Sequence, residues 1–226
     1  LFTRDFGKIG VMAKGARRNK NAFDSALDLL SVCRIVFIRK SSDALDLLTE
    51  AKLERRFRGG ERGLPNLYAG YYVAELLREF TDEDDPHPEL FDAAEHALQE
   101  LCAEQSAAST VIRFELTALR LLGHAPSLHY CAETGEPVEL EGKVPFGVHA
   151  GGVLGPNGRG RRAQWMMVDA SVLQLMDAFL REDESWRQAA VDRKMLGELR
   201  KVVNPYLYHL LGRKPRMHDY LAWFSK

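Results

Sequence analysis

The chain changes its hydrophobic period at Arg55-Arg-Phe-Arg-Gly-Gly-Glu-Arg-Gly63. Before this basic, glycine-rich segment the apolar residues tend to alternate with polar ones, which is typical of strands. After it they recur at spacings of three and four, which is typical of helices. Glycine lets the backbone turn between the two kinds of structure. The sequence therefore predicts an α+β protein, with a strand-rich domain at residues 1–60 and a helical domain at residues 61–226.

Upstream of the hinge, three segments are predicted to be strands. The alternation from Ile9 to Lys14 predicts the first, and Gly15 permits a turn after it. Cys33–Arg39 is rich in β-branched and aromatic residues, and Ala44–Ala51 follows it after a polar turn. The intervening segment Phe23–Leu30 fits a strand or a single helical turn, and its residues do not decide between them.

Downstream of the hinge, apolar spacing predicts a series of helices. The first runs from about Pro65 to Leu77 and the second from Leu90 to Leu101, with an acidic loop between them that includes Asp82–Asp85. A third helix covers Val111–Leu122, and Gly123 is expected to end it. The helical domain is thus expected to begin with three amphipathic helices.

A glycine- and proline-rich insertion at about 129–165 interrupts the helical pattern and predicts a loop or a small β excursion. Asp169 or Ser171 is expected to cap the helix that follows. The last helix covers Leu196–Leu211, and Pro205 is expected to kink it or split it in two.

The composition is that of a globular protein. The chain has 226 residues, 46% of them hydrophobic and 28% charged. No apolar run approaches the roughly 20 residues that span a bilayer, and no signal-peptide pattern is present. The three cysteines are odd in number and widely spaced. This pattern argues against a disulfide framework and predicts a reducing, cytoplasmic compartment.

The first twenty residues form a basic cluster. They carry six lysines and arginines against one acid, Asp5, whereas the whole chain has a net charge of only −1. A local positive cluster on a nearly neutral chain favours a polyanionic partner such as nucleic acid. The alternative is a basic edge strand that is merely solvated, since exposed lysines commonly protect sheet edges. The cluster consists of Arg4, Lys8, Lys14, Arg17, Arg18 and Lys20.

Three further sequence patterns resemble catalytic, metal-binding or phosphate-binding sites. Cys131 near His129 resembles a thiol–imidazole pair, but a structural cysteine is favoured. The run Asp82–Asp85 could hold Mg²⁺, although adjacent prolines favour a solvated loop. The glycines from Gly151 to Gly160 lack the lysine of a phosphate-binding loop. None of these patterns predicts an enzyme.

The order of several motifs resembles that of the RecO family of bacterial DNA repair and recombination mediator proteins. The resemblance spans nearly the whole chain, and it is the spacing of the motifs together that is specific. The matching segments are Thr3-Arg-Asp-Phe-Gly-Lys8, Ala13-Lys-Gly-Ala-Arg-Arg18, Tyr72-Val-Ala-Glu-Leu76, Phe114-Glu-Leu-Thr-Ala-Leu-Arg-Leu-Leu-Gly-His-Ala-Pro-Ser-Leu128 with Cys131 beyond it, and Tyr206-Leu-Tyr-His-Leu-Leu-Gly-Arg-Lys-Pro215.

This resemblance implies an N-terminal OB-fold barrel followed by a helical domain with a small zinc-binding insertion. It implies a non-enzymatic protein that binds single- and double-stranded DNA and promotes strand annealing. The implied partners are RecR, single-strand-binding protein and, indirectly, the recombinase RecA. Family members begin with a strand before the Thr3 segment, so we expect the barrel here to lack its first strand and to have an open edge.

The zinc ligands of the family are largely absent from this chain. Where the family has two Cys-x-x-Cys pairs, this sequence has Cys131-Ala-Glu-Thr134 and Gly155-Pro-Asn-Gly158. A tetrahedral zinc site cannot be built from one cysteine, and His129 and His149 have no suitable spacing. We therefore expect no zinc, and an insertion held by its turns and by packing of Val144, Phe146, Val148 and Leu154.

The sequence thus predicts a DNA-binding surface on the N-terminal domain. A second basic group near the C-terminus, which includes Lys194, Arg200 and Lys201, is predicted to meet DNA or an acidic protein tail. The alternatives are a protein–protein scaffold without direct DNA binding and a metal-dependent nuclease. The residues expected to contact DNA are Arg4, Lys8, Lys14, Arg17, Arg18, Lys20, Arg34 and Arg39, with Lys40, Arg55, Arg56 and Arg58 extending the track.

Overall fold

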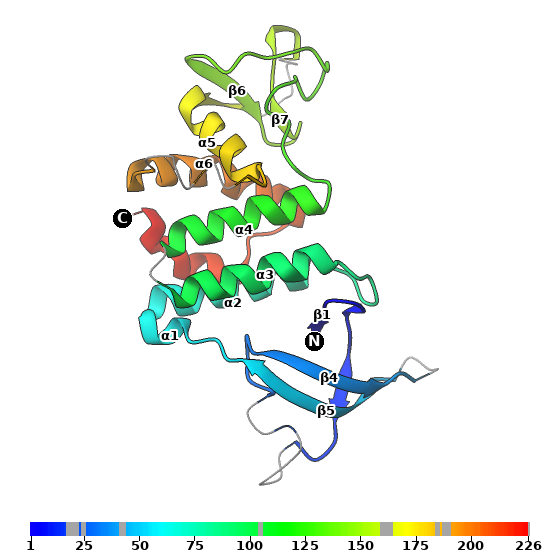
Figure 1. Ribbon diagram of the computed structural model, residues 1–226. Coiled ribbons are helices and arrows are strands. Elements are labelled where there is room, and N and C mark those ends of the chain that lie inside the picture. Colours follow the sequence, from blue (N-terminus) through cyan, green and yellow to red (C-terminus); the bar gives the residue numbers. More distant parts are fainter. Residues whose placement is uncertain are drawn as a thin grey trace. The chain divides into compact units, whose positions relative to one another are not determined.

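A computed structural model describes residues 1–16, 23, 26–40, 44–103, 106–158, 165–183, 186 and 191–225, except for the side chains of 222–225. The chain forms two compact units, Leu1–Ala107 and Ala108–Lys226 (Figure 1). Strands and helices occur in both, so the protein is of the α+β class. The domain boundary predicted at residue 60 lies inside the first unit and stays a prediction.

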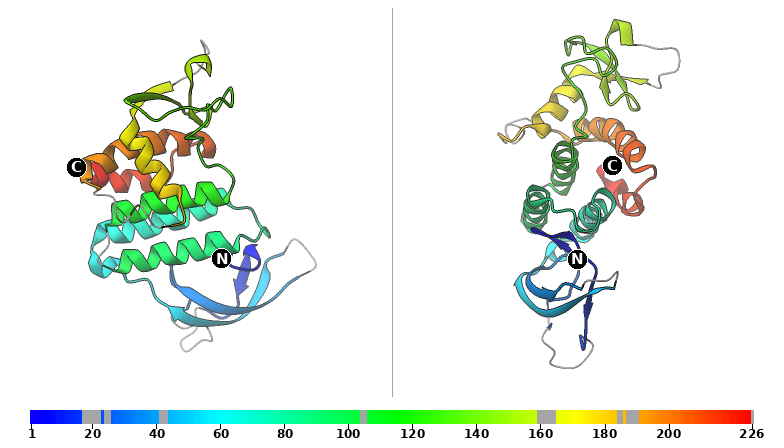
Figure 2. Two further views of the ribbon diagram at one scale, coloured as in Figure 1. Left: turned by 45° about the horizontal axis from the view of Figure 1, so that its top comes forward. Right: turned by 90° about the vertical axis from the view of Figure 1, so that its right-hand side faces the viewer.

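The first unit begins with five strands. β4 (Val32–Ile38) and β5 (Asp46–Arg55) form an antiparallel pair, and β3 (Val11–Ala13) pairs in parallel with β5. β1 (Phe2–Thr3) and β2 (Gly7–Lys8) form a separate short hairpin. Exposure alternates along β4, as the period of two predicts, and Figure 2 shows that β4 and β5 are curved. The three predicted strands are confirmed, with small shifts at their ends.

The sheet does not close into a barrel within the part of the chain that the structure describes. The strand order is β3–β5–β4, so β3 and β4 each have a side that no other described strand covers. Leu48 of β5 and Ile9 are buried, at 2% and 3% exposure. The segment Phe23–Leu30 was predicted to be either a strand or a helical turn. Its described residues, Phe23 and 26–30, form turns and belong to neither a strand nor a helix.

Three helices complete the first unit: α1 (Gly59–Arg62), α2 (Leu64–Phe80) and α3 (Pro88–Cys102). Prolines occupy the first turns of α2 and α3, where the missing N–H has no helical partner. The two long helices lie side by side (Figure 1). The helix residues Tyr72, Leu76, Leu90 and Leu101 are buried in the core.

The second unit contains nearly all of α4 (Ala107–Leu121), followed by the glycine-rich insertion and two more helices, α5 (Ala170–Leu180) and α6 (Arg193–Leu211). The insertion contains β6 (Lys143–Gly147), β7 (Gly152–Val153), a 3₁₀ turn η1 (Pro156–Gly158) and β8 (Trp165–Asp169). These strands form a sheet in the order β7–β6–β8, which confirms the β excursion. A 3₁₀ segment η3 (Arg216–Ser225) ends the unit.

Pro205 was predicted to kink α6 or to split it in two. The helix is continuous across Pro205, so it is not split, and the kink stays a prediction. Proline removes one backbone hydrogen bond, to the carbonyl of Lys201, whose side chain is exposed. On either side of Pro205, the buried residues Val202, Val203, Tyr206 and Leu207 fix the helix by packing. Gly212 ends α6 in the left-handed conformation, with φ of 65°.

Candidate nucleic-acid interface

The outer face of the three-stranded sheet carries exposed basic side chains from each strand region. Lys14 directly follows β3 and is exposed. Arg34 on β4 lies opposite Lys52 on β5, and both are exposed. Arg34 also pairs with Glu54 at 2.8 Å. The Arg34 side chain is 77% exposed and the Glu54 side chain is 43% exposed. Such an exposed pair is weak, so the guanidinium remains available to a phosphate.

Apolar side chains lie next to these cations on the same face. Met12, Leu47 and Ile38 occupy one row across β3, β5 and β4 according to the strand register. Met12, Val36 and Ile38 are 43%, 50% and 57% exposed, which is high for side chains of this size. The surface therefore combines the cations Lys14, Arg34 and Lys52, which are interspersed with Glu50 and Glu54, with an apolar strip, and we call it the outer sheet face.

Three of the predicted DNA-binding residues, Arg17, Arg18 and Lys20, lie outside the described residues. They follow Lys14 in the sequence, at the end of the strand that borders the outer sheet face. Their contribution to DNA binding stays a prediction.

Arg4 and Lys8 hold the hairpin β1–β2 against the helices of the same unit. The guanidinium of Arg4 donates two hydrogen bonds to the carboxylate of Asp92 in α3, at 2.8 and 2.9 Å. The Arg4 hydrogen bond lowers the pKa of Asp92. Lys8 Nζ donates to the carbonyls of Arg78 and Thr81, at 3.1 and 2.5 Å. A cation at these carbonyls neutralises the negative end of α2.

Arg39 makes a comparable contact with the acidic loop between α2 and α3. Its guanidinium lies 2.8 Å from the carboxylate of Asp84, and Asp85 pairs with His87. Asp82–Asp85 are all exposed, as the predicted solvated loop requires, and two of these acids also pair with other side chains. Arg55 likewise pairs with Glu95 of α3. These cations have intramolecular partners that a nucleic acid would have to displace.

Gly7 permits the close approach of the hairpin to this acidic loop. Its φ is +68°, and a Cβ at this position would lie 2.1 Å from the backbone oxygen of Asp85. The adjacent Lys8 carbonyl accepts a hydrogen bond from Asp84 N at 3.0 Å. Only glycine satisfies both the backbone conformation and the space.

Substituting Gly7→Ala is expected to lower the free energy of unfolding of the first unit by about 2 kcal/mol, because the left-handed conformation is strained for alanine and the methyl group would clash with Asp85. Urea unfolding followed by far-UV circular dichroism measures this loss. Gly60→Ala is the matched control, since a Cβ there would meet only Leu67 at 3.7 Å. Equal stability of the two variants would contradict the close approach.

Lys52 belongs to the outer sheet face, but it is not among the residues that the sequence predicted to contact DNA. The signal that could have identified it is the alternation of exposed Glu50, Lys52 and Glu54 along β5, which places all three on one face. Arg56 and Arg58 are exposed beyond the end of β5. Lys40 is also exposed, and its backbone N–H donates to Asp46.

In the second unit, only some residues of the predicted C-terminal basic group are exposed. Arg200 is 3% exposed and donates to both carboxylate oxygens of Glu115, at 2.5 and 2.6 Å. Its assignment to a DNA or protein contact is therefore wrong, because the helical period places it on the buried face of α6. Lys194 and Lys201 are exposed on the same helix.

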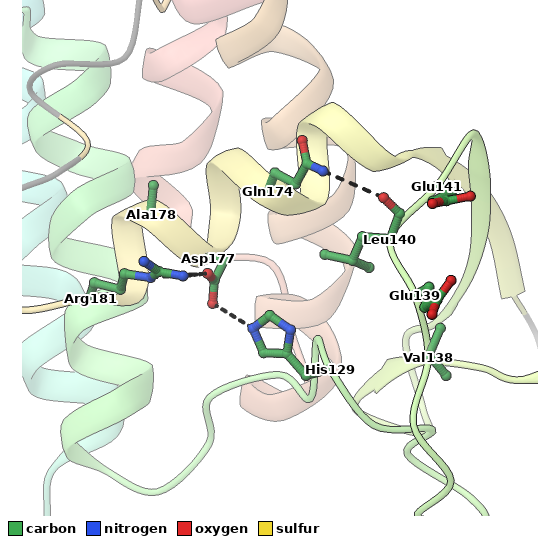
Figure 3. Close-up of a pocket in the computed structure, with 9 residues that line it drawn as sticks. All are labelled: His129, Val138, Glu139, Leu140, Glu141, Gln174, Asp177, Ala178 and Arg181. Atoms are coloured by element: carbon green, nitrogen blue, oxygen red, sulfur yellow. Dashed lines mark hydrogen bonds and ion pairs between the residues drawn. The ribbon is translucent and has the colours of Figure 1, made fainter.

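An open hollow of about 650 Å³ lies between α5 and the loop that precedes β6 (Figure 3). Asp177 of α5 is contacted by His129 at 3.1 Å and by Arg181 at 2.7 Å. Gln174 donates to the carbonyl of Leu140 at 3.4 Å. The carboxylate of Asp177 is therefore paired with an imidazole and a guanidinium. The groups that act on the Cys131 thiol are Thr134, Gly155 and Glu133, and His129 is not among them.

No group of three or more His, Cys, Asp or Glu side chains is arranged to hold a metal ion within the described part of the chain. His149 instead packs edge to face on His209, with ring centroids 4.3 Å apart. Among the described helices, none combines the length and apolar character needed to cross a membrane.

Comparison with known proteins assigns the chain to a family. Residues 1–57 match the family model described as Recombination protein O N terminal, and residues 62–219 match Recombination protein O C terminal. The DNA repair protein RecO of Rhodopirellula baltica is 39% identical over 245 residues, covering 98% of this chain and 91% of the relative. The RecO of Anaeromyxobacter dehalogenans strain 2CP-C is 31% identical, covering 95% and 84%. The chain therefore belongs to the RecO family of DNA repair proteins.

Proposed function

We propose that this chain is a recombination mediator that binds single- and double-stranded DNA and promotes strand annealing. In the same proposal, it acts with RecR to load RecA on DNA coated by single-strand-binding protein. It works through binding and not through an enzymatic step. Family membership supports the general role, and the outer sheet face supports direct DNA contact.

The observation that carries this proposal is the grouping of Lys14, Arg34 and Lys52 on one sheet face beside an apolar strip. Cations at these positions can follow a phosphate backbone, while exposed apolar side chains can contact unstacked bases. Such a surface has little sequence preference. It also lowers the repulsion between two strands that anneal on it.

We further propose that residues 1–57 have an OB-type arrangement. Two features support this: β3 pairs in parallel with β5, and β4 pairs antiparallel with β5 around a curved sheet. Small Greek-key barrels of this kind bind oligonucleotides on one face of the sheet. Lys14, which directly follows β3, would then lie at the border of that face.

Replacing Lys14, Arg17 and Arg18 with Ala is expected to weaken single-strand binding and to make its dependence on salt shallower. The slope of log affinity against log salt is expected to fall by about 2–3, because each lost phosphate contact no longer releases a counterion. Fluorescence anisotropy with a labelled oligonucleotide across a salt series measures both quantities. The matched control removes three exposed cations that are not predicted to contact DNA, Arg78, Lys143 and Arg181, and its slope should stay at the wild-type value. Equal slopes in both triple variants would contradict the assignment to this surface.

A second candidate is a protein–protein scaffold that does not bind DNA directly. It is favoured by the intramolecular pairing of Arg4, Lys8 and Arg39, and by the sequence pI of about 6.7. A gel shift at low and moderate salt separates the two functions. Retained binding to RecR without any shift of DNA would establish the scaffold.

A further inference from the structure

Two turns of the insertion meet at the sulfur of Cys131. In the first turn, Gly135 N donates to the Cys131 carbonyl at 2.8 Å, and Cys131 N donates to the Glu136 carbonyl at 2.7 Å. The second turn is η1, in which Gly158 N donates to the Gly155 carbonyl at 3.1 Å. Cys131 is 2% exposed, and its Sγ is the atom nearest to a Cβ built on Gly158. The thiol therefore fills the space between the turns.

Both turns approach the sulfur closely: a Cβ built on Gly155 would lie 3.9 Å from it, and one built on Gly158 would lie 2.5 Å from it. Burial would raise the pKa of the Cys131 thiol, but hydrogen bonds from the Thr134 side chain and from backbone groups of Gly155, Glu133 and Thr134 outweigh it, so the pKa is lowered. Thr134 and Gly155 come from different turns. The thiol thus links segments that are more than twenty residues apart in the sequence.

A zinc ion does not fit these residues. The four positions that converge are Cys131, Thr134, Gly155 and Gly158, and they supply one thiol among them. Two sulfurs on one tetrahedral zinc lie about 3.8 Å apart, given bonds of about 2.3 Å. Here a Cβ on Gly158 would lie only 2.5 Å from the Cys131 sulfur. The turns have therefore closed around the thiol more tightly than they could around a metal centre.

We infer that the insertion is a metal-free ribbon, in which the buried Cys131 sulfur packs between the two turns and joins them where a structural zinc would. Gly158 is required because any side chain at this position would enter the volume of the sulfur. The sheet β7–β6–β8 adds to the ribbon through Val144, Phe146 and Leu154, which are at most 4% exposed. This inference does not depend on DNA binding.

The first test measures metal directly in the full-length wild-type protein. Mass spectrometry of metals is expected to find far less than one zinc per chain. EDTA is expected to leave the melting temperature unchanged when unfolding is followed by the tryptophan emission, to which Trp165 of β8 contributes. One zinc per chain, with a lower melting temperature in EDTA, would overturn the inference.

The second test uses the contact between Gly158 and the sulfur. Gly158→Ala is expected to lower the melting temperature by about 4–8 °C. Gly155→Ala is the matched control, because its Cβ would make only ordinary contacts of 3.6 to 3.9 Å. The double variant Cys131→Ala with Gly158→Ala should melt above the single Gly158→Ala variant, since the new methyl group then occupies the space of the sulfur. If the double variant melts lower still, the steric part of the inference is wrong.

Discussion

Replacing Glu115 with Leu is expected to lower the free energy of unfolding of the second unit by about 3–5 kcal/mol. The carboxylate of Glu115 is fully buried and accepts two hydrogen bonds from Arg200, itself 3% exposed. Its removal leaves a buried guanidinium charge without its carboxylate. Urea unfolding measured by tryptophan emission is the suitable assay, because Trp165, Trp186 and Trp223 all lie in this unit.

The double variant Glu115→Leu with Arg200→Met should recover most of this loss, because two apolar side chains can replace a buried ion pair at little cost. Glu198→Leu is the matched control. Glu198 forms an exposed ion pair with Lys201, at 2.7 Å, on α6, the helix that carries Arg200. Loss of this exposed pair should cost no more than about 1 kcal/mol. A loss below about 1 kcal/mol for Glu115→Leu would show that the pair does not stabilise the unit.

The second unit is expected to lose about 3 kcal/mol of stability as the pH falls from 6.5 to about 4. The pKa of His218 is lowered to about 4, first by burial and then by Arg200 and Lys214, which the nearby Asp219 opposes only in part. In the unfolded chain the imidazole binds its proton near pH 6.5. Because the unfolded state takes up the proton first, stability is fully present above pH 6.5 and falls through this window.

His218→Phe keeps an aromatic ring against Tyr208, whose ring centroid lies 5.3 Å from that of His218, but removes the titrating group. The difference in unfolding free energy between the variant and the wild type should therefore grow in favour of the variant as the pH falls from 6.5 to 4. His96→Gln, at an exposed position of the first unit, is the matched control and should leave the curve unchanged. Parallel pH curves for His218→Phe and the wild type would show that His218 is not held neutral by the fold.

Secondary structure followed from the sequence because it depends on local spacing. The strands at Cys33–Arg39 and Ala44–Ala51 and the helices around Tyr72 and Leu98 were visible as periods of two and of about three and a half residues. The partners of charged residues were not visible, since pairing depends on which elements meet in space. Arg4 and Asp92 are 88 residues apart, and neither shows in its local sequence that the other is its partner.

The candidate interface shows the same division. Net charge identified the N-terminal segment as the basic part of the chain, and alternation placed Lys14 at the end of a strand. Charge counting could not separate Lys14, which is exposed, from Lys8, which holds the end of α2. It also failed for Arg200, where the helical period of its buried neighbours Leu196, Leu199 and Val203 was the more informative signal.

The parallel pairing of β3 with β5 has a consequence for the order of folding. Val11 pairs with Asp46, thirty-five residues later, whereas β4 and β5 are neighbours in sequence. Closing a long loop costs entropy before the contacts compensate for it, so such pairings form late. During synthesis, β3 has no partner strand until β5 has left the ribosome. We therefore expect the β4–β5 hairpin to form first and β3 to pair with it last.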